Sequence, residues 1–216
     1  MTLDEIEDVV RTAALSVFGV VDCAGDAAAP DGAIALILLG PGEPGFWQHV
    51  TAEPEFADGA ADPLDRWSTR VITALADRLG GVAVFPFDGP PYAPFQRWAV
   101  ESGRAWPSPV GLLVHDIAGL WVSYRGAIAL PFDVTQSPAP AKPCDRCADQ
   151  PCLTACPVGA LTGDGYDLPR CHGHLDGAGA ATCMTHGCAV RASCPAGLGY
   201  GRIDTQSAFH MAHFHR

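Results

Sequence analysis

Lysine is almost absent from this sequence, since Lys142 is the only one among 216 residues. The formal net charge is −11. Residues 1–143 hold 18 acidic and 8 basic side chains, whereas residues 144–216 hold 6 and 5, so the acidity belongs to the first part of the chain. No stretch gathers the basic side chains that would follow a phosphate backbone. We therefore predict that nucleic acid is not a partner.

Long apolar runs are also missing. The longest, Ala33–Leu39, is far shorter than the roughly 20 residues that a membrane-spanning helix needs. The N-terminal segment MTLDEIEDVV is acidic where a signal peptide would be basic. These absences predict a cytoplasmic protein with no membrane partner. In that reducing compartment the nine cysteines are expected to be ligands or redox groups rather than disulfides.

Residues 1–135 alternate between helical and strand patterns, which predicts an α+β domain. A capping box, helical spacing of apolar side chains and glycine stops predict helices over residues 3–18, 63–79 and 95–101. Apolar runs and turn residues predict strands over 33–39 and 82–87, two more around a turn at 116–119, and another after Gly126. Pro86 places the strand over 82–87 near a sheet edge. The proline-rich segment 131–143 is read as a linker, so a second domain is expected over 136–216.

The segment CDRCADQPCLTACP, residues 144–157, has the spacing C-x2-C-x4-C-x3-C-P. A second, looser set of cysteines follows and also closes in Cys-Pro; its members are Cys171, Cys183, Cys188 and Cys194. Zinc is one reading, because structural zinc takes four ligands in two pairs. The Cys-Pro endings favour two [4Fe–4S] clusters instead, because in bacterial ferredoxins the last cysteine of such a run binds the other cluster.

The stretch from Cys144 to Cys194 resembles the ferredoxin-type domain of epoxyqueuosine reductases, in which an isolated cysteine about fifteen residues after the first Cys-Pro joins the second cluster. Cys171 stands fifteen residues after Cys156, and LPRCHGHLD around it is similar to an Arg-Cys segment of that family. The resemblance implies a ferredoxin-like second domain with two clusters. The implied ligands are Cys144, Cys147, Cys152 and Cys194 for the first cluster, and Cys156, Cys171, Cys183 and Cys188 for the second.

The first domain resembles the same family more weakly. In these reductases the N-terminal domain holds cobalamin, and an aspartate in an Asp-Ser/Thr-Gly/Ala-Pro segment supplies a proton. FDGP at residues 87–90 is similar, which implies that Asp88 is the catalytic acid, and Arg97 and Ala99 echo residues downstream of it. The family's Gly-Lys segment has no counterpart in SPVGLLVHD, residues 108–116. Because Asp-Gly is also ordinary turn chemistry, we favour a turn role for Asp88 and do not favour cobalamin.

Other residues are weaker candidates. Three histidines stand between the cysteines, where they could donate hydrogen bonds to sulfur: His172, His174 and His186. Three more crowd the C-terminus and are read as solvated: His210, His213 and His215. Cys23 lies alone in the first domain and is expected to be a small buried apolar residue.

The sequence favours an electron carrier over an enzyme. Its function would be ferredoxin-like, moving single electrons through two [4Fe–4S] clusters to a redox partner protein. No G-x-G-x-x-G fingerprint follows a predicted strand, so a bound flavin or nicotinamide donor is not expected. The alternatives are a cobalamin-dependent reductase that uses Asp88 and an iron–sulfur redox sensor.

Overall fold

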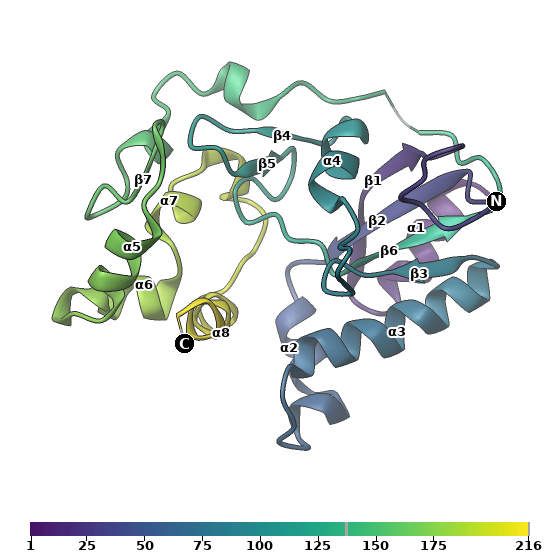
Figure 1. The fold of residues 1–216 in the computed structure, drawn as a ribbon, viewed down its shortest axis with the longest axis horizontal. Coiled ribbons are helices and arrows are strands. Elements are labelled where there is room, and N and C mark those ends of the chain that lie inside the picture. Colours follow the sequence, from purple (N-terminus) through teal and green to yellow (C-terminus); the bar gives the residue numbers. More distant parts are fainter. Residues whose placement is uncertain (137, 216) are drawn as a thin grey trace. The chain divides into compact units, whose positions relative to one another are not determined.

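The computed structural model describes residues 1–136 and 138–215. The described chain mixes helices and strands, in agreement with the predicted α+β class, and divides into two compact units (Figure 1). Each unit is built from two separate stretches of sequence. Unit 1 comprises Met1–Arg104 and Ser123–Pro140, and unit 2 comprises Ala105–Val122 and Ala141–Arg216.

Unit 1 contains an antiparallel sheet with the strand order β1-β2-β6-β3 (Figure 1). Its strands are β1 (Leu15–Asp22), β2 (Ala35–Pro41), β6 (Gly126–Leu130) and β3 (Val82–Val84). The predicted strand over 33–39 is confirmed as β2, which is buried along its whole length because it lies between β1 and β6. The strand predicted near the edge is β3, which ends two residues before Pro86.

Helix α1 (Leu3–Arg11) precedes the first strand of unit 1. The other helical elements of unit 1 in the described sequence lie between its strands: α2 (Phe46–Thr51), η1 (Pro54–Phe56), α3 (Pro63–Leu79) and α4 (Phe95–Glu101). The Thr2 hydroxyl accepts from the Glu5 amide while the Glu5 carboxylate accepts from the Thr2 amide, which confirms the capping box. Helices α1 and α3 contact each other as well as the sheet. The predicted helix over 95–101 is confirmed as α4.

Two predictions for unit 1 and its neighbourhood are wrong. The first helix ends at Arg11 and residues 15–18 belong to β1, because Val17, Phe18, Val20 and Val21 favour an extended strand in a buried sheet. The second of the two strands expected around the turn at 116–119 is also missing. Residues 120–125 have no strand pairing among the described residues, and the chain next becomes a strand at Gly126.

Unit 2 consists of short elements. Its strand pairs are β4 (Ala105–Pro107) with β5 (Leu113–His115) and β7 (Leu161–Thr162) with β8 (Gly165–Tyr166). Its α-helices are α5 (Leu168–Leu175), α6 (Ala181–His186), α7 (Ala189–Ala192) and α8 (Asp204–Phe214). Its 3₁₀ turns are η2 (Pro143–Arg146), η3 (Pro151–Leu153), η4 (Ala178–Ala180) and η5 (Pro195–Gly197).

The segment Ala105–Val122 packs with the cysteine-rich stretch in unit 2, although the sequence-based division had assigned it to the domain 1–135. The turn after β5 is the one predicted at 116–119. His115, which is fully buried, accepts hydrogen bonds at Nδ1 from the amides of Ile117 and Ala118. The described part of 131–143 forms no strand and no helix before η2 begins at Pro143, as expected for a linker.

Among the described residues, every helix is too short or too polar to cross a membrane.

Candidate metal centres

One cavity of about 530 Å³ in unit 2 is lined by Cys144, Cys147, Cys152 and Cys194. Cys144 lies in η2, Cys147 ends that turn, Cys152 lies in η3, and Cys194 directly precedes η5. Its volume falls in the range of about 300–1,000 Å³ that is typical of small-molecule and cofactor sites. The cavity therefore brings Cys194, from the second sequence set, to three cysteines of the first. We call these residues the first quartet.

The thiols of the first quartet interact electrostatically. Burial raises the pKa of Cys144, and negative charge on Cys194, Cys152 and Cys147 raises it further, while Lys142 lowers it. Burial likewise raises the pKa of Cys152, with contributions from Cys194 and Cys147. A metal centre bound between these thiols would supply a positive charge that offsets their mutual repulsion.

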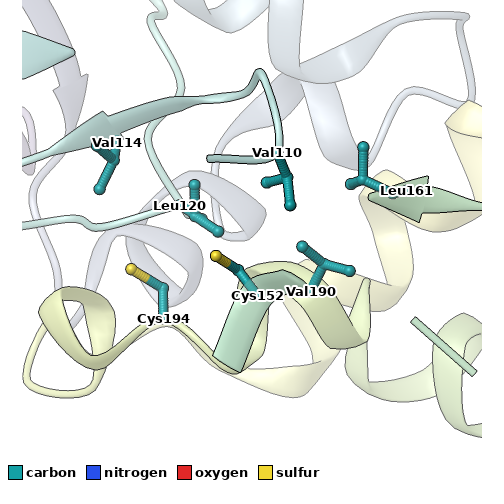
Figure 2. Packing of buried hydrophobic residues seen from close by; sticks show 7 residues of the cluster. All are labelled: Val110, Val114, Leu120, Cys152, Leu161, Val190 and Cys194. Carbon is teal, nitrogen blue, oxygen red and sulfur yellow. The ribbon is translucent and has the colours of Figure 1, made fainter. Parts of the chain in front are cut away.

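The β4–β5 hairpin and the turn after it add to a lining that comes mostly from residues 143–152 and 194–196. Val110, Val114 and Leu120 are buried in an apolar cluster that also contains the buried Cys152 and Cys194. Figure 2 shows both sulfur atoms pointing to the side on which Val114 and Leu120 lie. Sequence analysis missed these wall residues, although the shortage of large apolar side chains after residue 144 was a signal that this stretch needs a core from elsewhere.

A second group of thiols gathers around Cys183 of α6. Burial raises the pKa of Cys183, and negative charge on Cys188, Cys156 and Cys171 raises it further. Cys171 lies in α5, Cys188 directly precedes α7, and Cys156 follows η3. Cys183 therefore interacts with Cys156 from the first sequence set as well as with Cys171 and Cys188. We call these residues the second quartet.

The backbone after Cys156 curls around its sulfur. The amide of Ala160 donates a hydrogen bond to the Cys156 Sγ at 3.2 Å. Burial by itself would raise the pKa of Cys156, but amides of residues 158–161 outweigh it, so the pKa lies below the usual value. Successive amides that converge on one atom form an anion-binding nest, and this one stabilises a thiolate.

Side chains also reach the second quartet. The Tyr166 hydroxyl donates to the Cys171 Sγ at 3.3 Å, and burial together with this hydrogen bond raises the pKa of Tyr166. The His174 Nε2 lies 3.9 Å from the Cys183 Sγ. Arg191 is half-buried, and negative charge on Cys188 acts on it. These contacts surround the thiols with hydrogen-bond donors and a cation.

The two quartets fit iron–sulfur clusters in their donor chemistry. Within the described residues, no three His, Cys, Asp or Glu side chains converge as the ligands of a single metal ion would. A [4Fe–4S] cluster needs a different arrangement of ligands, because each of its four thiolates binds a separate iron of the cube. The first cavity also contains a buried hydroxyl, that of Ser108, with no hydrogen-bond partner in the described part of the chain. A cluster sulfur would give this hydroxyl an acceptor.

No protein-family model, curated protein or solved structure matches this chain.

The remaining histidines differ in their surroundings. His172 and His215 share a hydrogen bond of 2.7 Å between their Nδ1 atoms, and the His215 Nε2 lies 3.0 Å from an Asp176 carboxylate oxygen. His186 lies 3.5 Å from Asp204 at the beginning of α8. His215 is therefore fixed against α5, whereas sequence analysis had read it as solvated.

The candidates of unit 1 lie in a different setting. Asp88 is exposed in a turn between β3 and α4. Arg97 pairs with Asp26 at 2.8 Å and with Glu101 at 3.1 Å, and Ala99 is fully buried. Cys23 is buried, and burial together with Asp26 and Asp22 raises the pKa of its thiol. Of the residues that echo the reductase segment, Asp88 therefore lies exposed in a turn, Arg97 is ion-paired and Ala99 is packed in the core of unit 1.

Proposed function

We propose that this chain is an iron–sulfur electron-transfer protein whose unit 2 is a ferredoxin-like module with two [4Fe–4S] clusters. The first quartet would hold one cluster and the second quartet the other. The observation that carries this proposal is the exchange between the two sequence sets: Cys194 lies with Cys144, Cys147 and Cys152, while Cys156 lies with Cys171, Cys183 and Cys188. This exchange is the ligand pattern of two-cluster ferredoxins.

Zinc accounts for the same residues less well. Zinc knuckles bring neighbouring pairs of cysteines to one ion, and a run such as 144–156 would then keep its own four ligands together. Cys156 is instead grouped with Cys183 and Cys188, which are far from it in sequence. This grouping across the two sequence sets supports the cluster assignment. A [4Fe–4S] cluster takes up and gives back one electron at a time.

Unit 1 is proposed as a docking domain for a redox partner protein. None of the nine cysteines, all of which lie in the described part of the chain, forms a disulfide, which suits the proposed reducing compartment. Asp88 is assigned to its turn, because it is exposed and its Asp-Gly-Pro-Pro neighbourhood is turn chemistry. Neither cobalamin nor nucleic acid is part of this proposal.

Reversible one-electron chemistry tests the proposal. Protein purified without oxygen should show a broad absorbance band near roughly 400 nm, which a low-potential reductant bleaches and an artificial acceptor restores. The Asp88→Asn variant should pass electrons to the acceptor at the wild-type rate, and Asp31→Asn, another exposed carboxylate of unit 1, serves as its control. A spectrum without this band would contradict the proposal. A loss of transfer confined to Asp88→Asn would show that an enzyme acts through that carboxylate.

A further inference from the structure

The sulfur atoms of the second quartet receive more hydrogen bonds than those of the first. Cys156 lies in the nest of amides 158–161, with the Ala160 nitrogen 3.2 Å from sulfur. Cys171 accepts from the Tyr166 hydroxyl at 3.3 Å, and Cys183 has the His174 ring nitrogen at 3.9 Å. In the first quartet, the amides that act on Cys152 are its own and that of Leu153.

The positively charged side chains near the two quartets also differ in how they are held. The Arg191 guanidinium donates to the Leu120 carbonyl oxygen at 2.5 Å and lies within electrostatic reach of Cys188. Its place beside the second quartet is therefore held by the backbone. Lys142 acts on Cys144 in the first quartet, where Arg146 and Asp149, both exposed, also line the cavity and largely offset each other.

Solvent exposure does not separate the two quartets. The first contains two buried cysteines, Cys152 and Cys194, and the second contains the buried Cys183. The other members of both quartets have intermediate exposure. Because cluster potentials depend on hydrogen bonds to sulfur, nearby charge and exposure, the hydrogen bonds and Arg191 decide the difference.

We propose that the second quartet is the site of higher reduction potential, and that Tyr166 is a positioning residue that sets this potential through Cys171. This inference rests on the proposed function. In the redox step, an external one-electron donor is oxidised and the centre at the second quartet goes from [4Fe–4S]²⁺ to [4Fe–4S]¹⁺, while the first quartet stays oxidised. No bond breaks and no proton moves. Electrons would enter at either site and come to rest at the second.

The position of the Tyr166 ring supports this role. Tyr166 lies in β8, and its ring is stacked on Phe214 of α8, with an angle of 10° between the planes and 6.4 Å between the centroids. Phe214 also stacks on His172, whose neighbour in α5 is Cys171. The hydroxyl is therefore held towards the sulfur by contacts with the helix that carries the ligand and with α8. Since 41% of Tyr166 is exposed, removing its hydroxyl leaves the core of the unit unchanged.

The test is a potentiometric titration of the whole anaerobic protein, followed by electron paramagnetic resonance. Signals are assigned with Cys144→Ala for the first quartet and Cys171→Ala for the second. In half-reduced wild-type protein, the second site should carry the electron in at least about tenfold excess, which for one electron corresponds to about 59 mV. In Tyr166→Phe this ratio should fall roughly threefold to tenfold, the scale of losing one ordinary hydrogen bond. The potential of the first site should not move.

The control is Tyr92→Phe, which removes the hydroxyl of an exposed tyrosine in unit 1 and should leave both potentials unchanged. The inference is overturned if the first quartet is reduced first in the wild-type protein, or if Tyr166→Phe leaves the second potential unchanged or shifts both potentials equally. The order of reduction is read from the wild-type protein itself, and the two cysteine variants serve only to assign its signals. Failure of the proposed function would give a different result, because the protein would then bind no iron and show no paramagnetic signal at either site.

Discussion

At the scale of single residues, Cys156 and Cys194 have the same sequence context and exchanged surroundings. Each precedes a proline, and each lies with the cysteines of the other sequence set. Proline fixes its own φ and restricts the residue before it to extended conformations, which turns the chain away from its preceding neighbours. The observed φ and ψ of Cys194, −72° and 116°, are extended in this way.

The exchange of Cys156 and Cys194 between the two quartets predicts which paramagnetic signal each cysteine variant loses. Cys156→Ala should remove the paramagnetic signal that Cys171→Ala also removes, whereas Cys194→Ala should remove the signal that depends on Cys144. The physical reason is that each thiolate binds an iron of the cluster beside which it lies. Reduced samples of the single variants check this. If Cys156→Ala and Cys144→Ala abolish the same signal, the ligand sets are wrong.

Asp26 of unit 1 is a carboxylate that several hydrogen bonds stabilise in its charged form. It accepts from the Trp98 indole nitrogen at 2.8 Å, from the Ala28 amide at 3.0 Å and from Arg97 at 2.8 Å. These interactions, led by the Trp98 hydrogen bond, lower the pKa of Asp26 to about 2. Because its pKa is lower in the folded state, the stabilisation is complete above about pH 4 and is lost as the pH falls towards 2.

We therefore expect Asp26→Asn to lower the free energy of unfolding by about 1–2 kcal/mol at neutral pH. The difference between variant and wild type should shrink below about pH 4 and vanish near pH 2. Urea unfolding across this range, with Asp31→Asn as a matched exposed change, measures it. A difference that is the same at every pH would mean that packing and not charge explains the effect.

At the scale of elements, sequence patterns that lie within one helix predicted the structure correctly. Patterns that continue past the end of a helix did not. The capping box at Thr2 and the proline and glycine that bound α3 act within a few residues, so the sequence predicts them directly. The end of α1 could not be read this way, because Val17 and Phe18 continue the helical spacing by coincidence. What decides their conformation is pairing with β2, which is a contact with residues far away in sequence.

The candidate sites show the same contrast between local sequence signals and contacts that are far apart in sequence. The cysteine spacing and the Cys-Pro endings singled out the eight cysteines that form the first and second quartets, because these signals are local. The packing of Val110, Val114 and Leu120 with Cys152 and Cys194 was not predicted, since nothing in the segment 105–122 indicates which half of the chain it joins. Tyr166 was missed for a similar reason: its approach to Cys171 depends on the turn from β8 into α5.

Gly119 makes the role of the segment 105–122 testable. It has a φ of +55°, and a Cβ at this position would lie 2.5 Å from the backbone nitrogen of Gly197, in the turn that begins after Cys194. Gly119→Ala should therefore push that turn away and weaken the first quartet. Gly111→Ala in the β4–β5 loop is the control, because its φ is also positive, +76°, but nothing lies within 4 Å of the added Cβ.

We expect Gly119→Ala to destabilise unit 2 by about 1–3 kcal/mol more than Gly111→Ala does. Anaerobic urea unfolding, followed by the loss of iron–sulfur absorbance, compares the two variants. Equal midpoints would show that the contact between Gly119 and Gly197 has no part in holding the first quartet.

At the scale of the whole molecule, the two units have different kinds of core. Of the largest fully buried side chains in the described chain, all lie in unit 1 except Leu120. In unit 2, Cys152 and Cys194 are themselves members of the apolar cluster. We therefore predict that unit 1 folds on side-chain packing alone and that unit 2 depends on the proposed metal centres to complete its structure.

Chelation of iron should loosen unit 2 and leave unit 1 protected. Hydrogen exchange followed by mass spectrometry should show faster exchange over residues 105–122 and 141–215 after chelation, with β2 and α3 unchanged. The decisive peptide covers 105–122, because it lies among unit 1 residues in sequence and with the cysteines in the fold. Protection of that peptide after chelation would contradict the division into these units.

The central claim is that eight cysteines hold two [4Fe–4S] clusters, and metal and sulfide analysis of the anaerobically prepared protein tests it most directly. The account predicts about eight iron and about eight acid-labile sulfide per chain, with no stoichiometric zinc. Stoichiometric zinc with no iron and no sulfide after anaerobic reconstitution would contradict it.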